Sequence, residues 1–559
     1  MADGEFFSKK RMIARLSALE QRRSPHIKDW QKITQVIRPQ RGRYLEDDAE
    51  TSKRPTSMIN STPFVASRTL RAGMISGASS PAYEWFKFQL DDSEMMKWGP
   101  ARENLELRER IVADYLARSN FYQMLETVYG DSADFGTGQG IIDTHPRDFF
   151  TAKIFAPGEY FIDVDENGDV DTIYAKIPRT TLQIMSRWKE RASQKVKDAY
   201  DKGDYNTTFK VIQVIEPNQL ENSSRGDWQG KPWVKFIFEE TNKEDGENNY
   251  LEISGYEEWP GFGLRWDVAS GNTWGWGPGL VALGDAAALQ TLEFRDAQAV
   301  EKAVKPPMKA PIFLKNKPIS HTPGGVTYYD PYSANNANVE PLYTIMPGVL
   351  TALESKIAQA ERRVNEVYYK DLFLMLATTD RREITAREVE EKHQEKLLAL
   401  GPVLQRTHRD ALNNAIIRIY KILDEAGLFP PAPPELKQRL ISIRYTSALA
   451  YAQRAAGAAS LERFFGFTGN IVAAYPQIKH KINMNKGMDY YADAIGVPAE
   501  VMNSDDVANQ NAQAEAQAAA APQQAAMAKD VAQGAQLLSE TDTNRPSALS
   551  FLLGRSGLQ

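Results

Sequence analysis

The chain of 559 residues contains no cysteine. That absence excludes disulfide bonds, thiolate metal sites and thiol nucleophiles together, and it favours a reducing compartment. No apolar run approaches the roughly 18 residues that a membrane-spanning helix needs, and the first 16 residues lack the hydrophobic stretch of a secretory signal. We therefore expect a soluble protein with no membrane partner, made in the cytoplasm.

Motifs for catalysis are also missing. The sequence has no G-x-x-x-x-G-K-[ST] phosphate loop, no H-E-x-x-H and no G-x-S-x-G, and its six histidines are scattered along the chain. We therefore predict a protein without catalytic residues, cofactor or bound metal. A nuclease whose acidic residues converge only in the folded chain remains an alternative, because no sequence motif reveals such a site.

One segment resembles a calcium-binding loop at its start. Asp163, Asp165, Asn167 and Gly168 have the spacing of such a loop, but its twelfth position, which should be a bidentate glutamate, is Tyr174. The Asn-Gly pair is instead a strong signal for a tight turn between two strands. We predict a β-hairpin here and no calcium site.

The charge distribution limits any contact with DNA. The net charge is -6, whereas proteins that grip nucleic acid over their whole surface are usually strongly basic. Residues 9–43 nevertheless carry eleven Lys and Arg against two acidic residues, and residues 302–317 carry five lysines and no acid. Each group is either a solvated surface or a local patch that faces DNA or another partner.

Hydrophobic spacing predicts an α+β, mainly helical chain. Residues 8–37 form one amphipathic helix with a break at Ser24–Pro25, and residues 101–129 form another helix. Aromatic residues alternate in a strand at 85–90. From 140 to 264 the period changes to two, which predicts an antiparallel β-rich segment with one helix at 182–200.

Residues 275–376 have the pattern of a helix pair. Gly275, Gly277 and Gly279 allow a tight turn into a helix, prolines at 306 and 307 end it, and a second amphipathic helix begins at Pro347. Two helices held apart by an insert cannot bury all their apolar faces within one chain. Copies of the same chain are therefore the expected partners.

The remaining segments are mostly helical. Residues 385–427 form a long helix kinked at Gly401–Pro402, with a projecting polar tip before it, and a strand follows near 441–446. A shorter helical module occupies 447–501. The Ala- and Gln-rich residues 505–530 suit either a peripheral helix or a disordered tail.

Several motifs in a fixed order resemble one family, the portal proteins (head-to-tail connectors) of short-tailed, T7-like bacteriophages. They are LRAGMISGASSPAYEWF (70–86), WGWGPGLVALGDAAALQTLEFRDAQAVEKAVKPPMKAP (274–311), VNEVYYKDLFLML (364–376), ITAREVEEKHQEKLLALGPVLQRTHRDALNNAIIRIYKILDEAGLFPPAP (384–433), YTSALAYAQRA (445–455) and IGVPAEVM (495–502). The family more often has a Tyr and an Arg around the glycines of WGWGPG, so local contacts there remain open.

The resemblance implies a phage portal fold with named parts, assembled as a ring. Residues 1–270 would be the wing, with a helical N-terminal part and an antiparallel β-rich part, to which 385–446 adds a long kinked helix and a strand. The other parts would be the first stem helix (275–305), the clip (306–345), the second stem helix (346–373), the tunnel loop (374–384), the crown (447–502) and an Ala/Gln-rich tail (503–559) that forms a barrel or is disordered.

The resemblance also implies a function and its partners. The ring, usually a dodecamer, would sit at one capsid vertex in the virion after assembly in the host cytoplasm, and double-stranded DNA would be packaged and ejected through it. Its other partners would be the terminase, tail adaptor proteins, and the major capsid and scaffold proteins. We expect DNA contacts from the tunnel-loop residues Thr378, Thr379, Asp380, Arg381 and Arg382. We expect terminase or adaptor contacts from Lys309, Lys315, Lys317, His321, Tyr328 and Tyr329.

Two other classes remain open. A different virion structural or scaffold protein would form large assemblies without a central channel. A DNA-processing enzyme would require a cluster of acidic metal ligands and would show turnover on DNA.

Overall fold

The computed structural model describes residues 7–41, 58–92, 95, 98–220, 225–242, 249–269, 271–310, 312, 340–378, 400–434, 441–447, 449, 464–468 and 486–488. The chain divides into two compact units, Met1–Ala456 and Gly457–Gln559. In the second unit the described residues are helical, and the ring of Phe465 packs against Gly487. None of the helices in these ranges is both long enough and apolar enough to cross a lipid bilayer.

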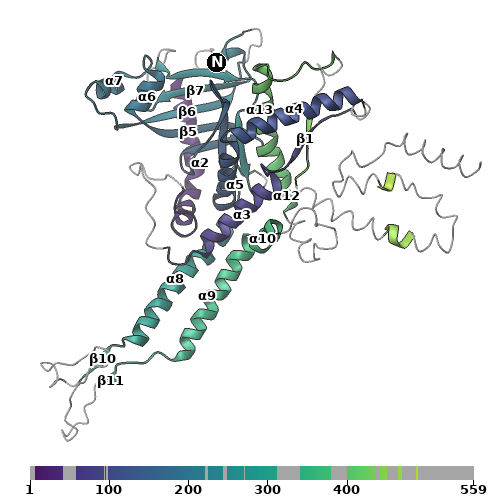
Figure 1. Ribbon diagram of the computed structural model, residues 1–559. Coiled ribbons are helices and arrows are strands. Elements are labelled where there is room, and N and C mark those ends of the chain that lie inside the picture. The colour runs from purple at the N-terminus through teal and green to yellow at the C-terminus, as the bar shows by residue number, and fades with distance from the viewer. Residues whose placement is uncertain are drawn as a thin grey trace, which may run out of the picture. The chain divides into compact units, whose positions relative to one another are not determined.

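The larger sheet of the first unit is an antiparallel meander (Figure 1). Its strands, in spatial order, are β4 (Tyr160–Val164), β5 (Val170–Thr180), β6 (Thr208–Pro217), β7 (Trp233–Glu239) and β8 (Glu252–Tyr256). Alternation along β6 puts Ile212 and Val214 in a cluster with Met12 and Leu16 of the first helix. Val211, on the opposite face, packs under the short helices that follow β5.

The predicted β-hairpin is confirmed. β4 and β5 pair in antiparallel register, and Gly168 has a φ of 80° in the turn between them. The Oδ1 atom of Asp165 accepts the backbone N–H groups of Asn167 and Asp169 at 2.9 and 2.8 Å. This carboxylate therefore stabilises the turn in the way expected of an Asx residue.

A second, three-stranded sheet has the order β3-β2-β9. Its strands are β2 (Thr137–His145), β3 (Phe149–Ile154) and β9 (Gly261–Arg265). The sequence predicted one β-rich segment over 140–264, but the structure separates it into two sheets, because β9 returns to pair with β2. The predicted helix at 182–200 is likewise two helices, α6 (Thr181–Trp188) and α7 (Gln194–Asp201).

Helix α2 (Lys9–Val36) runs through Pro25 without the predicted break. Proline removes one hydrogen bond from a helix, but packing on both sides of it holds this helix together. Met12 and Leu16 lie in the cluster on the meander, while Trp30 and Ile33 lie in the main core. Tertiary packing therefore overrides the local cost of the proline.

The basic residues of 9–43 fit neither sequence-based interpretation well, because most have partners inside the fold. The Nζ atom of Lys9 donates to the carbonyl oxygens of Asn242 and Asn249 at 3.0 and 2.9 Å. Arg11 and Arg15 each bond the buried carboxylate of Glu216 at 2.8 Å. The others with side-chain or carbonyl partners are Arg22, Arg23, Arg38 and Arg41.

The main hydrophobic core lies beneath these sheets. It is built by α3 (Thr62–Ala78), α4 (Gly99–Arg118), α5 (Phe121–Phe135) and the antiparallel pair of β1 (Phe86–Leu90) with β12 (Ile441–Tyr445). The predicted helix at 101–129 is divided between α4 and α5. The side chain of Asn120 at the division exchanges hydrogen bonds with the backbone of Ala152 in β3, at 2.8 and 3.0 Å.

The helix predicted over 385–427, with a kink at Gly401–Pro402, is described only from residue 400 onward, and its residues 385–399 lie outside the described ranges. α12 (Gly401–Arg406) begins at that point, so Pro402 lies in a first turn, where its missing N–H costs little. Within the described part, a π-helical stretch over Thr407–Asn413 leads into α13 (Asn414–Glu425).

Two helices, α8 (Pro278–Val304) and α9 (Pro347–Val367), lie side by side and run away from the rest of the first unit (Figure 1). We call this pair the arm. Its far end carries the short antiparallel pair β10 (Met308–Lys309) and β11 (Glu340–Pro341). A short α10 (Lys370–Thr378) follows α9, and Tyr369 between them has a φ of 52°. The remainder of the first unit is called the body.

Candidate functional site

The root of the arm is a place where backbones come into close contact. A Cβ atom on Gly277 or Gly279 would lie 2.3 Å from the carbonyl oxygen of Ala133 or Asp134, at the end of α5. A Cβ on Gly275 would lie 2.2 Å from the carbonyl oxygen of Gly136. No side chain fits at such distances, so the glycines of WGWGPG allow the arm to start directly against α5.

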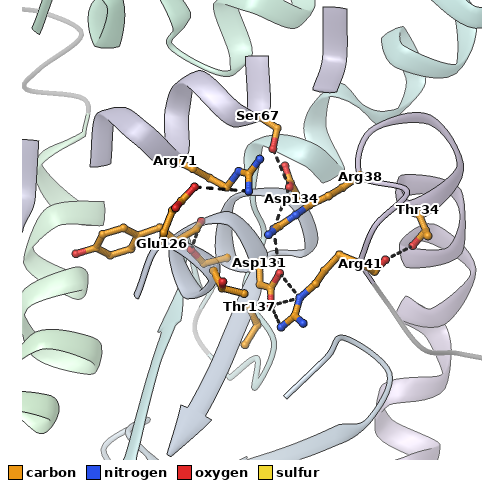
Figure 2. Close-up of polar contacts among 12 residues, drawn as sticks. Thr34, Arg38, Arg41, Ser67, Arg71, Glu126, Asp131, Asp134 and Thr137 are labelled. Carbon is orange, nitrogen blue, oxygen red and sulfur yellow. Dashed lines mark hydrogen bonds and ion pairs between the residues drawn. The ribbon is translucent and has the colours of Figure 1, made fainter. Parts of the chain in front are cut away.

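Two buried aspartates of α5 lie close to these contacts and bind arginines from the segment that follows α2 (Figure 2). Arg38 Nη1 lies 2.9 Å from Asp131 Oδ1 and 3.3 Å from Asp134 Oδ2. Arg41 binds both oxygens of Asp131, the shorter contact being 2.7 Å. Both aspartates are fully buried, and such charges are stable in the core only when paired in this way.

Asp134 also connects the arm to the body. Asp134 accepts hydrogen bonds from Ser67 of α3 at 2.8 Å and from the Tyr368 hydroxyl, just after α9, at 2.9 Å. Burial raises the pKa of Asp134, and the charge of Arg38 opposes that rise. Burial, followed by the negative charge of Asp134, raises the pKa of Tyr368 well above its ordinary value. The tyrosine hydroxyl therefore keeps its proton and remains the donor.

A second set of contacts holds the two arm helices together at their base. The amide of Gln290 in α8 bonds the backbone of Ile59 and Asn60, with Oε1 accepting at 2.7 and 2.8 Å. The Asn60 side chain donates to Glu293 of α8 at 2.6 Å and to Glu361 of α9 at 2.9 Å. The segment before α3 thus binds both helices.

Further along, the arm exposes large apolar side chains. Phe294 is 48% exposed, Val304 is 72% exposed and Met346 is 74% exposed. The other exposed apolar residues of this region are Val281, Val300, Met308, Ile312, Leu342, Tyr343 and Val349. So many exposed apolar residues on one projection are typical of a surface that a partner covers.

Few of the sequence-predicted site residues fall within the described ranges. Lys309 lies in β10 and forms an exposed ion pair of 3.1 Å with Glu340. Thr378 is the last residue of α10, so the first five residues of the predicted tunnel loop, 374–378, are helical in the structure. The remaining predicted site residues, which are Lys315, Lys317, His321, Tyr328, Tyr329, Thr379, Asp380, Arg381 and Arg382, lie outside the described ranges.

The structure adds residues that the sequence did not identify. Asp134, Gln290 and Tyr368 join the arm to the body, Asp131 holds the neighbouring arginines, and no motif marks these residues. The only signal was two acidic residues spaced three apart near the end of a largely buried helix, and the burial is visible only in the structure. Within the described ranges, no three His, Asp or Glu side chains are grouped so that they could hold a metal ion.

An arm with exposed apolar residues, anchored by a buried ionic cluster, defines a protein that is built to assemble. The sequence matches the profile of the family described as bacteriophage head to tail connecting protein over residues 9–502, and the chain belongs to this family. Its function is that of a phage portal protein in the virion, at the capsid vertex. The resemblance to portal proteins inferred from the motifs is thus confirmed.

Individual relatives align with this sequence over nearly its whole length. The portal protein of Salmonella phage epsilon15 is 33% identical over 552 residues, which covers 98% of each chain. The probable portal protein of Bordetella phage BPP-1 is 32% identical over 549 residues, which covers 97% of each chain. A chain from the neck of an empty gene transfer agent particle aligns over 72% of this chain and 86% of its own length at 12% identity, but its TM-score of 0.32 is too low to support an argument about the fold.

Proposed function

We propose that copies of this chain close into a ring, a dodecamer as is usual in the family, with the arms surrounding a channel for double-stranded DNA. The observation that carries the proposal is the set of exposed apolar residues on the arm. Each large apolar side chain that becomes fully buried contributes roughly 1.5–3 kcal/mol, so a handful of them supports stable association. A single chain leaves Phe294, Val304 and Met346 in water.

The root of the arm supports the same proposal. A ring in which arms contact one another needs each arm at a defined angle to its body, since misplaced arms could not meet all around a closed circle. Three sets of contacts restrict that angle: the glycine contacts of α8, the Tyr368–Asp134 hydrogen bond and the Gln290 contacts.

Within such a ring we propose the roles that the resemblance implies. The arm helices would form the stem and residues 306–345 the clip, which would dock the terminase during packaging and tail adaptors afterwards, while the wing would contact major capsid and scaffold proteins. Arg381 and Arg382 would contact passing DNA. A modestly acidic protein with a few basic residues suits a channel, because a uniformly basic lining would hold DNA through counterion release.

The assembly can be tested with purified full-length protein. We expect negative-stain images to show rings with an axial opening, and sedimentation to show one large species. Phe294→Asp places a charge among the exposed apolar residues and should shift the protein to monomers or small oligomers. Gln123→Glu adds the same charge at an exposed polar position of α5 in the body, away from the exposed apolar residues of the arm, and should preserve rings. Solid particles without an opening, or wild-type monomers, would contradict the proposal.

The DNA-related role can be tested in infected cells. A phage that lacks its own copy of this gene should package DNA when wild-type protein is supplied. Arg381→Gln combined with Arg382→Gln should lower the yield of DNA-filled heads while ring formation in vitro is unchanged. Equal yields with wild-type and variant protein would show that these arginines do not contact the DNA as proposed.

A further inference from the structure

A cavity of about 540 Å³ lies on the face of the five-stranded sheet that is turned away from α2. Its floor is formed by β5, β6 and β7 through Ile177, Val211, Gln213, Lys235 and Ile237. Helix α6 and the segment after β3 supply its walls. Cavities of roughly 300–1,000 Å³ are the usual size for small-molecule sites.

Charged side chains beside this cavity form a row in which positive and negative groups alternate. Asp143 Oδ2 lies 2.8 Å from Lys153 Nζ and 3.2 Å from Lys235 Nζ. Lys235 Nζ also lies 2.9 Å from Glu252 Oε1, and the other Glu252 oxygen lies 2.9 Å from Arg187 Nη2. Because this row of side chains begins and ends with a cation, it carries one positive charge in excess.

These groups are charged near neutral pH. Burial acts to raise the pKa of Asp143, but the charges of Lys235 and Lys153 outweigh it and hold the pKa below its ordinary range. Burial acts to lower the pKa of Lys235, whereas Tyr256, Asp143 and Glu252 raise it overall. Among the rest of the lining, Arg179 and Glu159 carry opposite charges, and Arg41 is paired with Asp131, so the excess charge of the row remains. The cavity is therefore positive on balance.

One donor in the floor of the cavity points to the kind of ligand. Gln213 is 8% exposed, and its Nε2 atom is buried without a hydrogen-bond partner among the described residues. An unsatisfied buried donor costs about 1–3 kcal/mol, so such groups usually face an acceptor. Gln213 lies in the lining of a positive cavity. An anionic oxygen there would accept the hydrogen bond of Gln213 and would also compensate the excess positive charge.

We propose that this cavity binds a small organic oxyanion, with a single carboxylate or phosphate group accepting from Gln213 and compensating the excess positive charge of Lys153, Lys235 and Arg187. The apolar side chains of Ile177, Val211 and Ile237 contact the body of the ligand. The site lies in the body, so its ligand would act by stabilising the folded sheet region to which it binds.

The test measures binding to the full-length protein by calorimetry and by the thermal midpoint of unfolding. The probes are inorganic phosphate, glycerol 3-phosphate and butyrate, with glycerol and butyramide as uncharged counterparts. We expect saturable binding and a raised midpoint with at least one anion and no effect of the uncharged compounds. A response to phosphates alone or to butyrate alone supports the site and identifies the head group.

Variants connect the binding to the cavity. Gln213→Leu removes the donor with little change of shape, and Lys153→Gln removes the terminal cation; each should weaken binding about tenfold or more. Lys176→Gln is the control, because Lys176 lies on the opposite face near Glu20 and Glu240. Thermal midpoints without ligand show whether each variant is folded. No saturable binding of any anion, or wild-type affinity in a folded Gln213→Leu protein, would overturn the proposal.

Discussion

The carboxylate of Asp131 shows how much a single residue contributes to this molecule. It is fully buried and binds two arginines, Arg38 and Arg41. Removal of one member of a buried ion pair leaves the other charge uncompensated in the core, which costs more than the pair itself contributes. The stability of the body next to the arm therefore depends on keeping the buried carboxylate together with its arginines.

We predict that Asp131→Asn destabilises the folded body by about 3–5 kcal/mol. Urea unfolding followed by tryptophan fluorescence should detect this, since the Trp30 indole bonds the carbonyl of Phe135 nearby at 2.9 Å. The control is Asp285→Asn, which breaks an exposed pair with Arg363 and should cost less than about 1 kcal/mol. Equal effects of the two variants would contradict a dominant role of the buried cluster.

Glu109 makes stability depend on pH. Burial raises its pKa to about 7, although the N–H of Phe88 donates to its Oε1 atom at 2.6 Å. A folded-state pKa above the unfolded value means that the folded state holds the proton more tightly. The contribution of Glu109 to stability is therefore complete below about pH 4.5 and is lost as the pH rises through 7.

We expect Glu109→Gln to remove this dependence, because glutamine accepts from Phe88 without a charge. The thermal midpoint of the variant should exceed that of the wild type at pH 8 and match it at pH 4.5, as measured by differential scanning fluorimetry. Glu103→Gln, at an exposed position on the same helix whose charge does not contribute to the pKa of Glu109, should change neither midpoint. A variant that is less stable than wild type at pH 8 would show that the charge of Glu109 is favourable.

At the scale of elements, the start of α8 is set by close contact and not by helix propensity. Gly279 lies in the first turn, where a Cβ would collide with the backbone of Asp134, whereas Gly284 in the same helix has no atom within 4 Å of the corresponding position. The same residue type thus has a structural role at one position and none at the other.

Two substitutions of the same kind should therefore have opposite effects. Gly279→Ala should lower the thermal midpoint, because α5 must move away from the arm. Gly284→Ala should raise stability slightly, by up to about 1 kcal/mol, the difference in helix propensity between the two residues. Thermal unfolding of the two proteins side by side measures this, and a neutral Gly279→Ala would mean that the backbones at the root separate easily.

At the scale of the whole molecule, the exposed residues of the arm predict the physical character of the proposed ring. Assembly through apolar burial is insensitive to salt screening, whereas assembly through surface ion pairs weakens as salt rises. We expect the sedimentation profile of the rings to be the same in 0.1 M and 1 M NaCl, at roughly 10 and 3 Å screening lengths. Dissociation at high salt would assign the contacts to charged residues.

The sequence by itself determined the features that depend on neighbouring residues. The two arm helices, the hairpin at Gly168 and the strand at 86–90 follow from hydrophobic period and turn chemistry, which act over a few residues. The order of motifs along the chain was sufficient to identify the family. The lack of cysteine excluded thiol chemistry without any structure.

Only the tertiary structure decided which polar residues lie inside. Arg38 and Asp131 are 93 residues apart in sequence, and nothing near either one predicts their ion pair. The same holds for the uninterrupted helix through Pro25, for the return of β9 to β2 and for the cavity beside Gln213. Local patterns reflect local energies, whereas a buried charge or a close backbone contact depends on which distant segments the packed core brings together.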